Sequence, residues 1–180
     1  MQDITLRHLT PMTFKDTAEY KQSASMNPHC NDIYYKVFNA TKVTRTQDTP
    51  LDMEFAIDVI VKLPNGSQLT GQEKALSYSY SKYNTFTMEF YQNRSTKEQG
   101  EFFKIASQFY LSGYTNHSLN GFASWKIIDM PRLMLWINSV YNLEQLELKS
   151  IPSSGLASFI AIPYPDIPKD CYIATSEDCE

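Results

Sequence analysis

Hydrophobic and polar residues alternate most regularly between residues 55 and 63. One side of this segment carries only apolar side chains, namely Phe55, Ile57, Val59, Val61 and Leu63. The other side mixes polar and apolar residues, and a period of two is typical of a β-strand. We therefore predict a strand over residues 55–63, a turn over residues 64–66 and a partner strand over residues 67–76.

The remaining segments predict a mixture of strands and helices. Residues rich in Tyr, Val, Phe and Thr predict further strands at 33–46, 85–91, 122–128 and 156–162. Apolar stripes and capping residues predict helices at 11–24, from the apparent capping box at Ser95 to about residue 113, and after Asp129.

The order of these elements predicts an α/β (α+β) fold with a central mixed sheet flanked by helices. Residues 1–162 are long enough to form one domain with its own core. Residues 163–180 are acidic and contain proline, and they predict an irregular tail that packs in part through Tyr164, Ile167 and Tyr172.

The turn at Pro64-Asn65-Gly66 decides which residues of the two strands face each other. A two-residue turn over Asn65 and Gly66 would require an N–H from Pro64, which has none. A three-residue loop, with Pro64 first in a type I turn and Gly66 in the left-handed region, avoids this requirement. This loop pairs Leu63 with Ser67 and places Asp58 opposite Gln72.

The predicted register gathers polar side chains in the middle of apolar strands. Asp58, Gln72 and Lys74 share one face, and Glu73 points to the other. A carboxylate in a central strand is unfavourable unless it is paired or binds a cation. Two interpretations are open, an Asp58–Lys74 ion pair at a sheet edge or a metal-dependent phosphodiesterase. In the second, Asp58, the Gln72 side-chain oxygen and the Glu73 backbone carbonyl would ligate Mg²⁺ or Mn²⁺, and Lys74 would be the catalytic cation.

Asp58, a hairpin and then Gln72-Glu73-Lys74 resemble the metal site of the PD-(D/E)XK nuclease superfamily, whose members have a restriction-endonuclease-like fold. The signature of that family is an Asp, a gap of variable length and then acid-x-Lys. The resemblance covers roughly residues 10–162, is nearest to phage-type members without an established activity, and implies an αβββαβ core. It also implies a Mg²⁺-dependent deoxyribonuclease that hydrolyses phosphodiester bonds of DNA.

The chain departs from this family in two places. Gln72 stands where the family has an acid, and Gln108 is followed four positions later by Ser112 rather than by the Tyr of a Gln-x-x-x-Tyr motif. The acid that the family carries on its first helix would be Glu19 or Asp32, and the spacing does not choose between them. Four residues after the motif strand are candidates to contact nucleic acid, namely Tyr78, Tyr80, Lys82 and Tyr83.

Charge and composition qualify this interpretation. The net charge is −4, but residues 144–180 hold seven acids and two bases, so the remaining chain has a net charge of +1. Three cysteines and the lack of a signal peptide or membrane span favour a cytoplasmic protein, in the host cytoplasm if it is viral. DNA is the expected partner, no membrane is expected, and a homodimer is left open.

Two alternative functions follow from the same sequence. Because Gln72 is uncharged, the chain is also interpretable as a catalytically degenerate nucleic-acid-binding or assembly protein on the same fold. Four Asn-x-Ser/Thr sequons, at Asn39, Asn65, Asn93 and Asn116, keep open a secreted, glycosylated β-rich binding protein.

Overall fold

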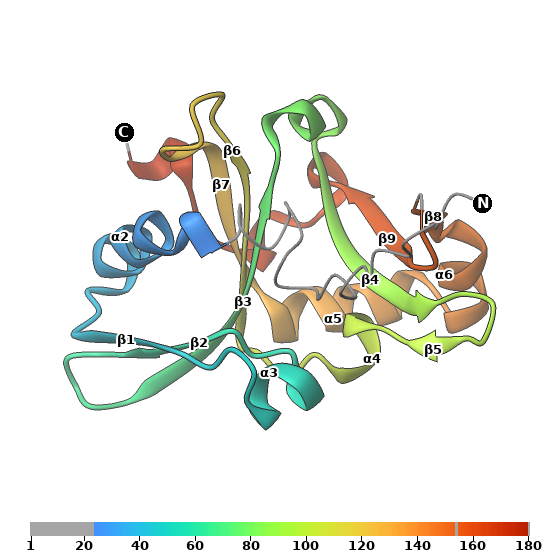
Figure 1. Ribbon diagram of the computed structural model, residues 1–180, viewed down its shortest axis with the longest axis horizontal. Coiled ribbons are helices and arrows are strands. Elements are labelled where there is room, and N and C mark those ends of the chain that lie inside the picture. The colour runs from blue at the N-terminus through green and yellow to red at the C-terminus, as the bar shows by residue number, and fades with distance from the viewer. Residues whose placement is uncertain (1–23, 154, 180) are drawn as a thin grey trace, which may run out of the picture.

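The computed structural model describes residues 24–153 and 155–179, and within them it shows a mixed α+β fold with two sheets (Figure 1). The larger sheet has six strands in the spatial order β1 (Lys42–Arg45), β2 (Val59–Lys62), β3 (Gln68–Leu76), β6 (Phe109–Thr115), β7 (Phe122–Asp129) and β10 (Tyr172–Thr175). The smaller sheet has four strands in the order β5 (Glu98–Gln99), β4 (Thr85–Asn93), β9 (Ser158–Pro163) and β8 (Ile151–Pro152). All neighbouring strands are antiparallel except β3 and β6, which are parallel.

The helices cover the faces and ends of these sheets. They are α2 (Asn27–Phe38), α3 (Pro50–Phe55), α4 (Glu101–Lys104), α5 (Met130–Val140) and α6 (Leu143–Lys149). Four 3₁₀ segments connect other elements, namely η2 (Tyr78–Tyr83), η3 (Tyr164–Asp166), η4 (Lys169–Cys171) and η5 (Ser176–Cys179). None of these helices has the length and apolar character needed to span a bilayer.

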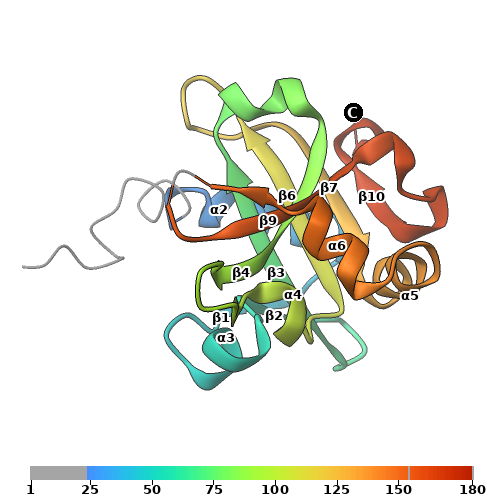
Figure 2. The ribbon, with the colours of Figure 1, turned by 90° about the vertical axis from the view of Figure 1, so that its right-hand side faces the viewer.

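The six-stranded sheet buries a different core on each of its faces. One face packs against α2, where Cys30, Ile33 and Tyr34 meet apolar residues of β2, β6 and β7. The other face packs against β4, β9 and α5 through a larger core that includes Phe86 and Tyr110. Figure 2 shows β4 and β9 lying across the face of β3 and β6. Because both of its faces are covered, β6 is buried along its whole length.

The hairpin between β2 and β3 has the predicted register. Val59 pairs with Gly71 and Lys62 with Gln68, and Leu63 N–H donates to Ser67 C=O over 2.9 Å. Gly66 has a φ of 87°, as the three-residue loop requires. The strands predicted at 67–76, 85–91, 122–128 and 156–162 and the helix capped by Asp129 are also confirmed.

The strand predicted over residues 33–46 is wrong in its first part. Residues 27–38 form α2, and only Lys42–Arg45 is a strand. Pro28 lies in the first turn of α2, where the missing N–H does no harm, so it is compatible with the start of a helix. The buried residues Cys30, Ile33 and Tyr34 have helical spacing, which the β-propensity of Tyr and Val concealed. The helix predicted at 11–24 falls outside the described residues except for residue 24.

The helix predicted from Ser95 to about residue 113 is also wrong. Ser95 does not begin a helix. The N–H groups of Ser95 and Thr96 instead donate to Asn93 Oδ1. A helix of one turn, α4, follows, and the chain then enters the centre of the sheet as β6. A strand buried on both faces lacks the alternation of a half-exposed one, so periodicity could not distinguish it from a helix.

Three shorter segments also differ from the prediction. Residues 50–55 form α3, which Ala56 ends with a φ of 48°, so the predicted strand begins only at Val59. The capping box of Asn142 and Gln145 begins α6, which the sequence did not predict. The predicted tail is not irregular throughout, because β10 pairs with β7 in the large sheet, while Tyr164 and Ile167 are buried as expected.

The contact between β3 and β6 gives a direct test of this fold. A Cβ atom added at Gly71 would lie 2.2 Å from Cζ of the Phe109 ring. We expect Gly71→Ala to lower the free energy of unfolding by about 1–3 kcal/mol, because the buried ring must move to make room. Urea unfolding measures this loss.

Gly121→Ala is the matched control. Its added Cβ would have only Asn116 Nδ2 within 4 Å, at an ordinary 3.5 Å. We expect a change within about 0.5 kcal/mol for this exchange. Equal effects at the two positions would contradict the packing of β3 against β6.

Candidate functional site

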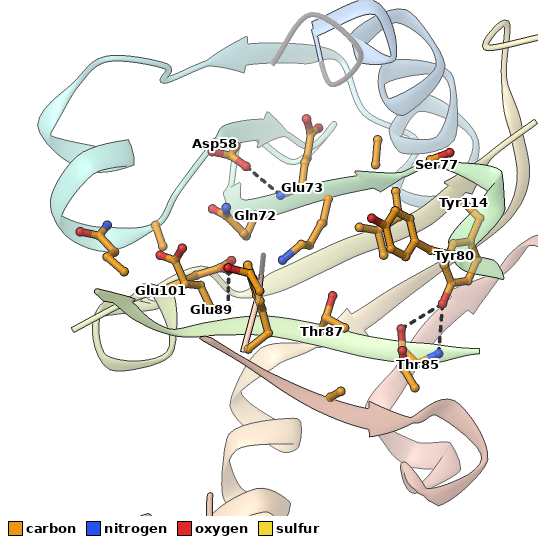
Figure 3. Close-up of a pocket in the computed structure, with 18 of the residues that line it drawn as sticks. Asp58, Gln72, Glu73, Ser77, Tyr80, Thr85, Thr87, Glu89, Glu101 and Tyr114 are labelled. Carbon is orange, nitrogen blue, oxygen red and sulfur yellow. Dashed lines mark hydrogen bonds between the residues drawn. The ribbon is translucent and has the colours of Figure 1, made fainter. Parts of the chain in front are cut away.

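A cleft with a volume of about 1210 Å³ lies between the two sheets. One wall is the second half of β3, and the facing wall is formed by β4 and β9 (Figure 3). Residues of α3 and α4 line one end of the cleft, and η2 lines the other. Asp58, Gln72 and Lys74, which the sequence placed on one face, all line this cleft.

The first part of the site is the free edge of β3. The last residue of β3 that pairs with β2 is Gly71. The chain that precedes β2 turns at Ala56 and reaches this edge of β3 only at Asp58, so no strand pairs with β3 on this side beyond Gly71. Asp58 N–H donates to Gly71 C=O, and Asp58 Oδ2 accepts the Glu73 N–H, each over 2.9 Å. The carboxylate therefore takes the place that a further backbone carbonyl of β2 would have occupied. Because the N–H and C=O of one strand residue point to the same side, the Glu73 carbonyl also faces this edge.

Burial makes Asp58 an unusual carboxylic acid. It raises the pKa of Asp58 to about 8, and the nearby carboxylates of Glu73, Asp52 and Glu101 act in the same direction. The hydrogen bond from the Glu73 N–H opposes this shift, because it stabilises the charged form. Asp58 is thus largely protonated at neutral pH unless a cation lies beside it.

Gln72 and Lys74 follow on the same face of β3. Gln72 Oε1 is buried and has no hydrogen-bonding partner in the part of the chain that the structure describes. Lys74 Nζ lies 4.7 Å from the centre of the Phe159 ring on β9. The structure shows no ion pair between Asp58 and Lys74, both of which are described, so the sheet-edge ion pair is wrong.

Glu73 points to the opposite face of β3, as the register predicted. Its carboxylate forms an ion pair with Arg45 and accepts a hydrogen bond of 2.6 Å from the Tyr34 hydroxyl. Arg45 also donates to the Asn31 side chain and to the Asn27 carbonyl of α2. This network binds β3 to α2 and β1, and Asn27, Arg45 and Glu73 also line the cleft.

Three further acids of the cleft were not found from the sequence. Asp52 on α3, Glu89 on β4 and Glu101 on α4 line it, and Glu101 Oε2 accepts the Glu89 N–H over 3.4 Å. Glu101 Oε1 is buried and makes no hydrogen bond within the described residues. Burial raises the pKa of Glu89, and the positive charge of Lys74 opposes that shift. The sequence predicted a long helix that includes Glu101, and no local signal reveals that α4 is a single turn at the end of a cleft.

The other candidate residues are only partly brought to the cleft. Tyr80 and Tyr83 line it, whereas the Tyr78 ring packs on His117 with 3.8 Å between centroids. Lys82 Nζ lies 5.0 Å from the centre of the Tyr83 ring. Of the two remaining candidates, Asp32 is exposed on α2 and does not line the cleft, whereas Glu19 lies outside the described residues.

The donor set of the site is therefore one carboxylate, one amide oxygen and one backbone carbonyl. Within residues 24–153 and 155–179, no three His, Cys, Asp or Glu side chains gather closely enough to hold a metal ion by themselves. All three cysteines are free. No family model, curated protein or solved structure matches this chain.

The raised pKa of Asp58 predicts how stability depends on pH. The folded form binds the Asp58 proton more tightly than the unfolded form, so this group stabilises the fold at low pH and the effect is lost as pH rises through about 8. Asn at position 58 keeps an oxygen for the Glu73 N–H but does not titrate. We expect Asp58→Asn to gain stability relative to wild type by at least about 1 kcal/mol between pH 5 and pH 8 in metal-free buffer.

Urea unfolding of both proteins over this pH range measures the effect. Shifts of other groups, such as Glu89, are largely common to the two proteins and cancel in the difference. Parallel stability curves for the two proteins would contradict a buried, proton-binding Asp58.

Proposed function

We propose that the cleft is the active site of a metal-dependent nuclease that hydrolyses phosphodiester bonds of DNA. The observation that carries this proposal is the free edge of β3, where the Asp58 carboxylate and the buried, unpartnered Gln72 Oε1 line the same cleft as Lys74. An unpartnered polar atom in a buried position is costly and calls for a ligand.

The oxygen donors of this edge fit a hard divalent cation. Asp58, Gln72 Oε1 and the Glu73 carbonyl would hold Mg²⁺ or Mn²⁺, which prefer such ligands. When bound, the metal supplies an activated water and offsets the charge of the phosphate. A cation next to Asp58 would also favour the ionised carboxylate and remove the penalty that burial imposes on it.

The remaining polar side chains have distinct roles in this proposal. Lys74 carries its positive charge on the same face of β3 as Gln72 and would stabilise the charge that develops on the attacked phosphate. Glu101 lines the cleft and would accept a hydrogen bond from the attacking water. The network of Glu73, Arg45 and Tyr34 keeps β3 fixed while these groups act.

The order of elements also supports the proposal. The chain runs through α2, β1, α3, β2, β3, α4 and β6, with η2, β4 and β5 inserted after β3 and the two strands placed in the second sheet. Apart from α3 and this insertion, the order is the αβββαβ order that the resemblance to the PD-(D/E)XK family implies.

The uncharged Gln72 leads to a prediction about metal affinity. Gln72→Glu replaces a dipole with a charge beside Asp58 and should tighten Mn²⁺ binding about tenfold. Isothermal titration calorimetry measures this affinity. Gln68→Glu is the control, because Gln68 is on the same strand but is exposed and outside the cleft. Equal Mn²⁺ affinity of Gln72→Glu and wild type would exclude Gln72 as a ligand.

Lys74 provides the test of the catalytic role. We expect Lys74→Met to lower the rate of Mg²⁺-dependent DNA cleavage by about 10²–10³-fold, because it removes one preorganised charge from the transition state. DNA binding in Ca²⁺ should change little, since one charge is a small part of backbone affinity. Lys62→Met, at an exposed position of β2 outside the cleft, should match wild type in both assays.

Other results of this experiment have definite meanings. Equal losses of binding and cleavage in Lys74→Met would make Lys74 a simple electrostatic contact and would overturn its catalytic role. DNA binding by wild type with no cleavage in Mg²⁺ or Mn²⁺ would favour a degenerate nucleic-acid-binding protein on this fold.

A further inference from the structure

The end of the cleft opposite α4 is formed by tyrosines. Tyr80 and Tyr83 of η2 line it, and their side chains are 53% and 59% exposed. Their ring centroids lie 6.4 Å apart with an interplanar angle of 37°. Large aromatic residues with this exposure contribute little to the core and leave their ring faces open to a ligand.

We infer that the cleft takes an unpaired nucleic-acid strand, whose bases stack on Tyr80 and Tyr83 while a phosphate lies beside Lys74. This inference rests on the proposed nuclease function and names its substrate class. Base–aromatic stacking is the main sequence-independent contact in proteins that bind single strands.

The position of the reacting groups between two sheets favours an unpaired strand over a duplex. Asp58, Gln72 and Lys74 line one wall, and Thr87, Glu89 and Phe159 line the facing wall. The cleft is bounded on both sides, and its volume of about 1210 Å³ is near that of pockets that enclose a small ligand, so it suits a short segment of one strand better than a duplex.

Further polar groups of the cleft suit the backbone of such a strand. Ser77, Thr85 and Thr87 also line the cleft (Figure 3). Their hydroxyl groups are able to donate to phosphate and sugar oxygens. Lys82, with Nζ 5.0 Å from the Tyr83 ring centre, adds a positive charge at the rim.

The charge of the chain also favours an unpaired strand over a duplex. Duplex binding depends on many Lys and Arg contacts to phosphates. The whole chain has a net charge of −4, and the residues that line the cleft include five acids and three bases, namely Asp52, Asp58, Glu73, Glu89 and Glu101 against Arg45, Lys74 and Lys104. Stacking supplies affinity without a broad basic surface, so an unpaired strand is the better match.

The test compares one labelled oligonucleotide, alone and annealed to its complement, by fluorescence anisotropy in Ca²⁺. We expect the single strand to bind at least about tenfold more tightly than the duplex. Tyr80→Ala should weaken single-strand binding by about 5–100-fold, whereas Tyr80→Phe should keep it, because the phenyl ring still stacks. The control is Tyr35→Ala on α2, since Tyr35 is 47% exposed and lies outside the cleft.

A parallel cleavage assay in Mn²⁺ separates this inference from the proposed function. Binding or cleavage of the duplex equal to that of the single strand would overturn the inference and leave the nuclease intact. Single-strand binding that depends on Tyr80 but leads to no cleavage would support the inference and remove the hydrolytic function. A loss in Tyr35→Ala equal to that in Tyr80→Ala, or no binding to either substrate, would overturn the inference.

Discussion

The structure depends on the point at which β2 stops pairing with β3. Beyond Gly71 the edge of β3 has no neighbouring strand on that side, and the Asp58 side chain satisfies the Glu73 N–H in its place. A carboxylate is a strong acceptor, but in this buried position it is also an unfavourable charge. The Asp58 side chain therefore takes the place of a neighbouring strand and completes the hydrogen bonding of the sheet at this edge. It also leaves an acid that lines the cleft.

Side chains alternate between the two faces of β3, and the two faces have different surroundings. Glu73 faces α2, where Arg45 and Tyr34 fully engage its carboxylate, and Gln72 and Lys74 face the cleft, where Gln72 Oε1 has no partner among the described residues. Packed and paired groups on one face hold the strand in place, whereas the buried Gln72 Oε1 on the other face is left unsatisfied within the described part of the chain. Such local violations of good packing are expected where a ligand completes the site.

The sequence was sufficient wherever one local rule decided the outcome. The missing N–H of Pro64 fixed the hairpin register, and the register placed Asp58 opposite Gln72 and turned Glu73 away. The sequence was insufficient where tertiary packing decided. The Tyr-rich start of α2 has strand propensity, but Cys30, Ile33 and Tyr34 are buried together only in a helix that covers the sheet. Glu101 could not be placed because its position depends on β6 joining β3, a long-range contact that no local pattern records.

The parallel pairing of β3 with β6 explains why a cleft exists. Two parallel neighbours require a crossover connection, and this one includes η2, β4, β5 and α4. Because β4 then pairs with β9, the crossover becomes part of a second sheet that stands opposite β3. One wall of the cleft is thus formed by residues that lie close to Asp58 in the sequence. The facing wall combines β4, which precedes β6 and β7 in the chain, with β9, which follows them. The metal ligands suggested by a short motif therefore belong to the wall that folds locally, and Tyr80, Tyr83, Glu89 and Glu101 are added by the crossover itself.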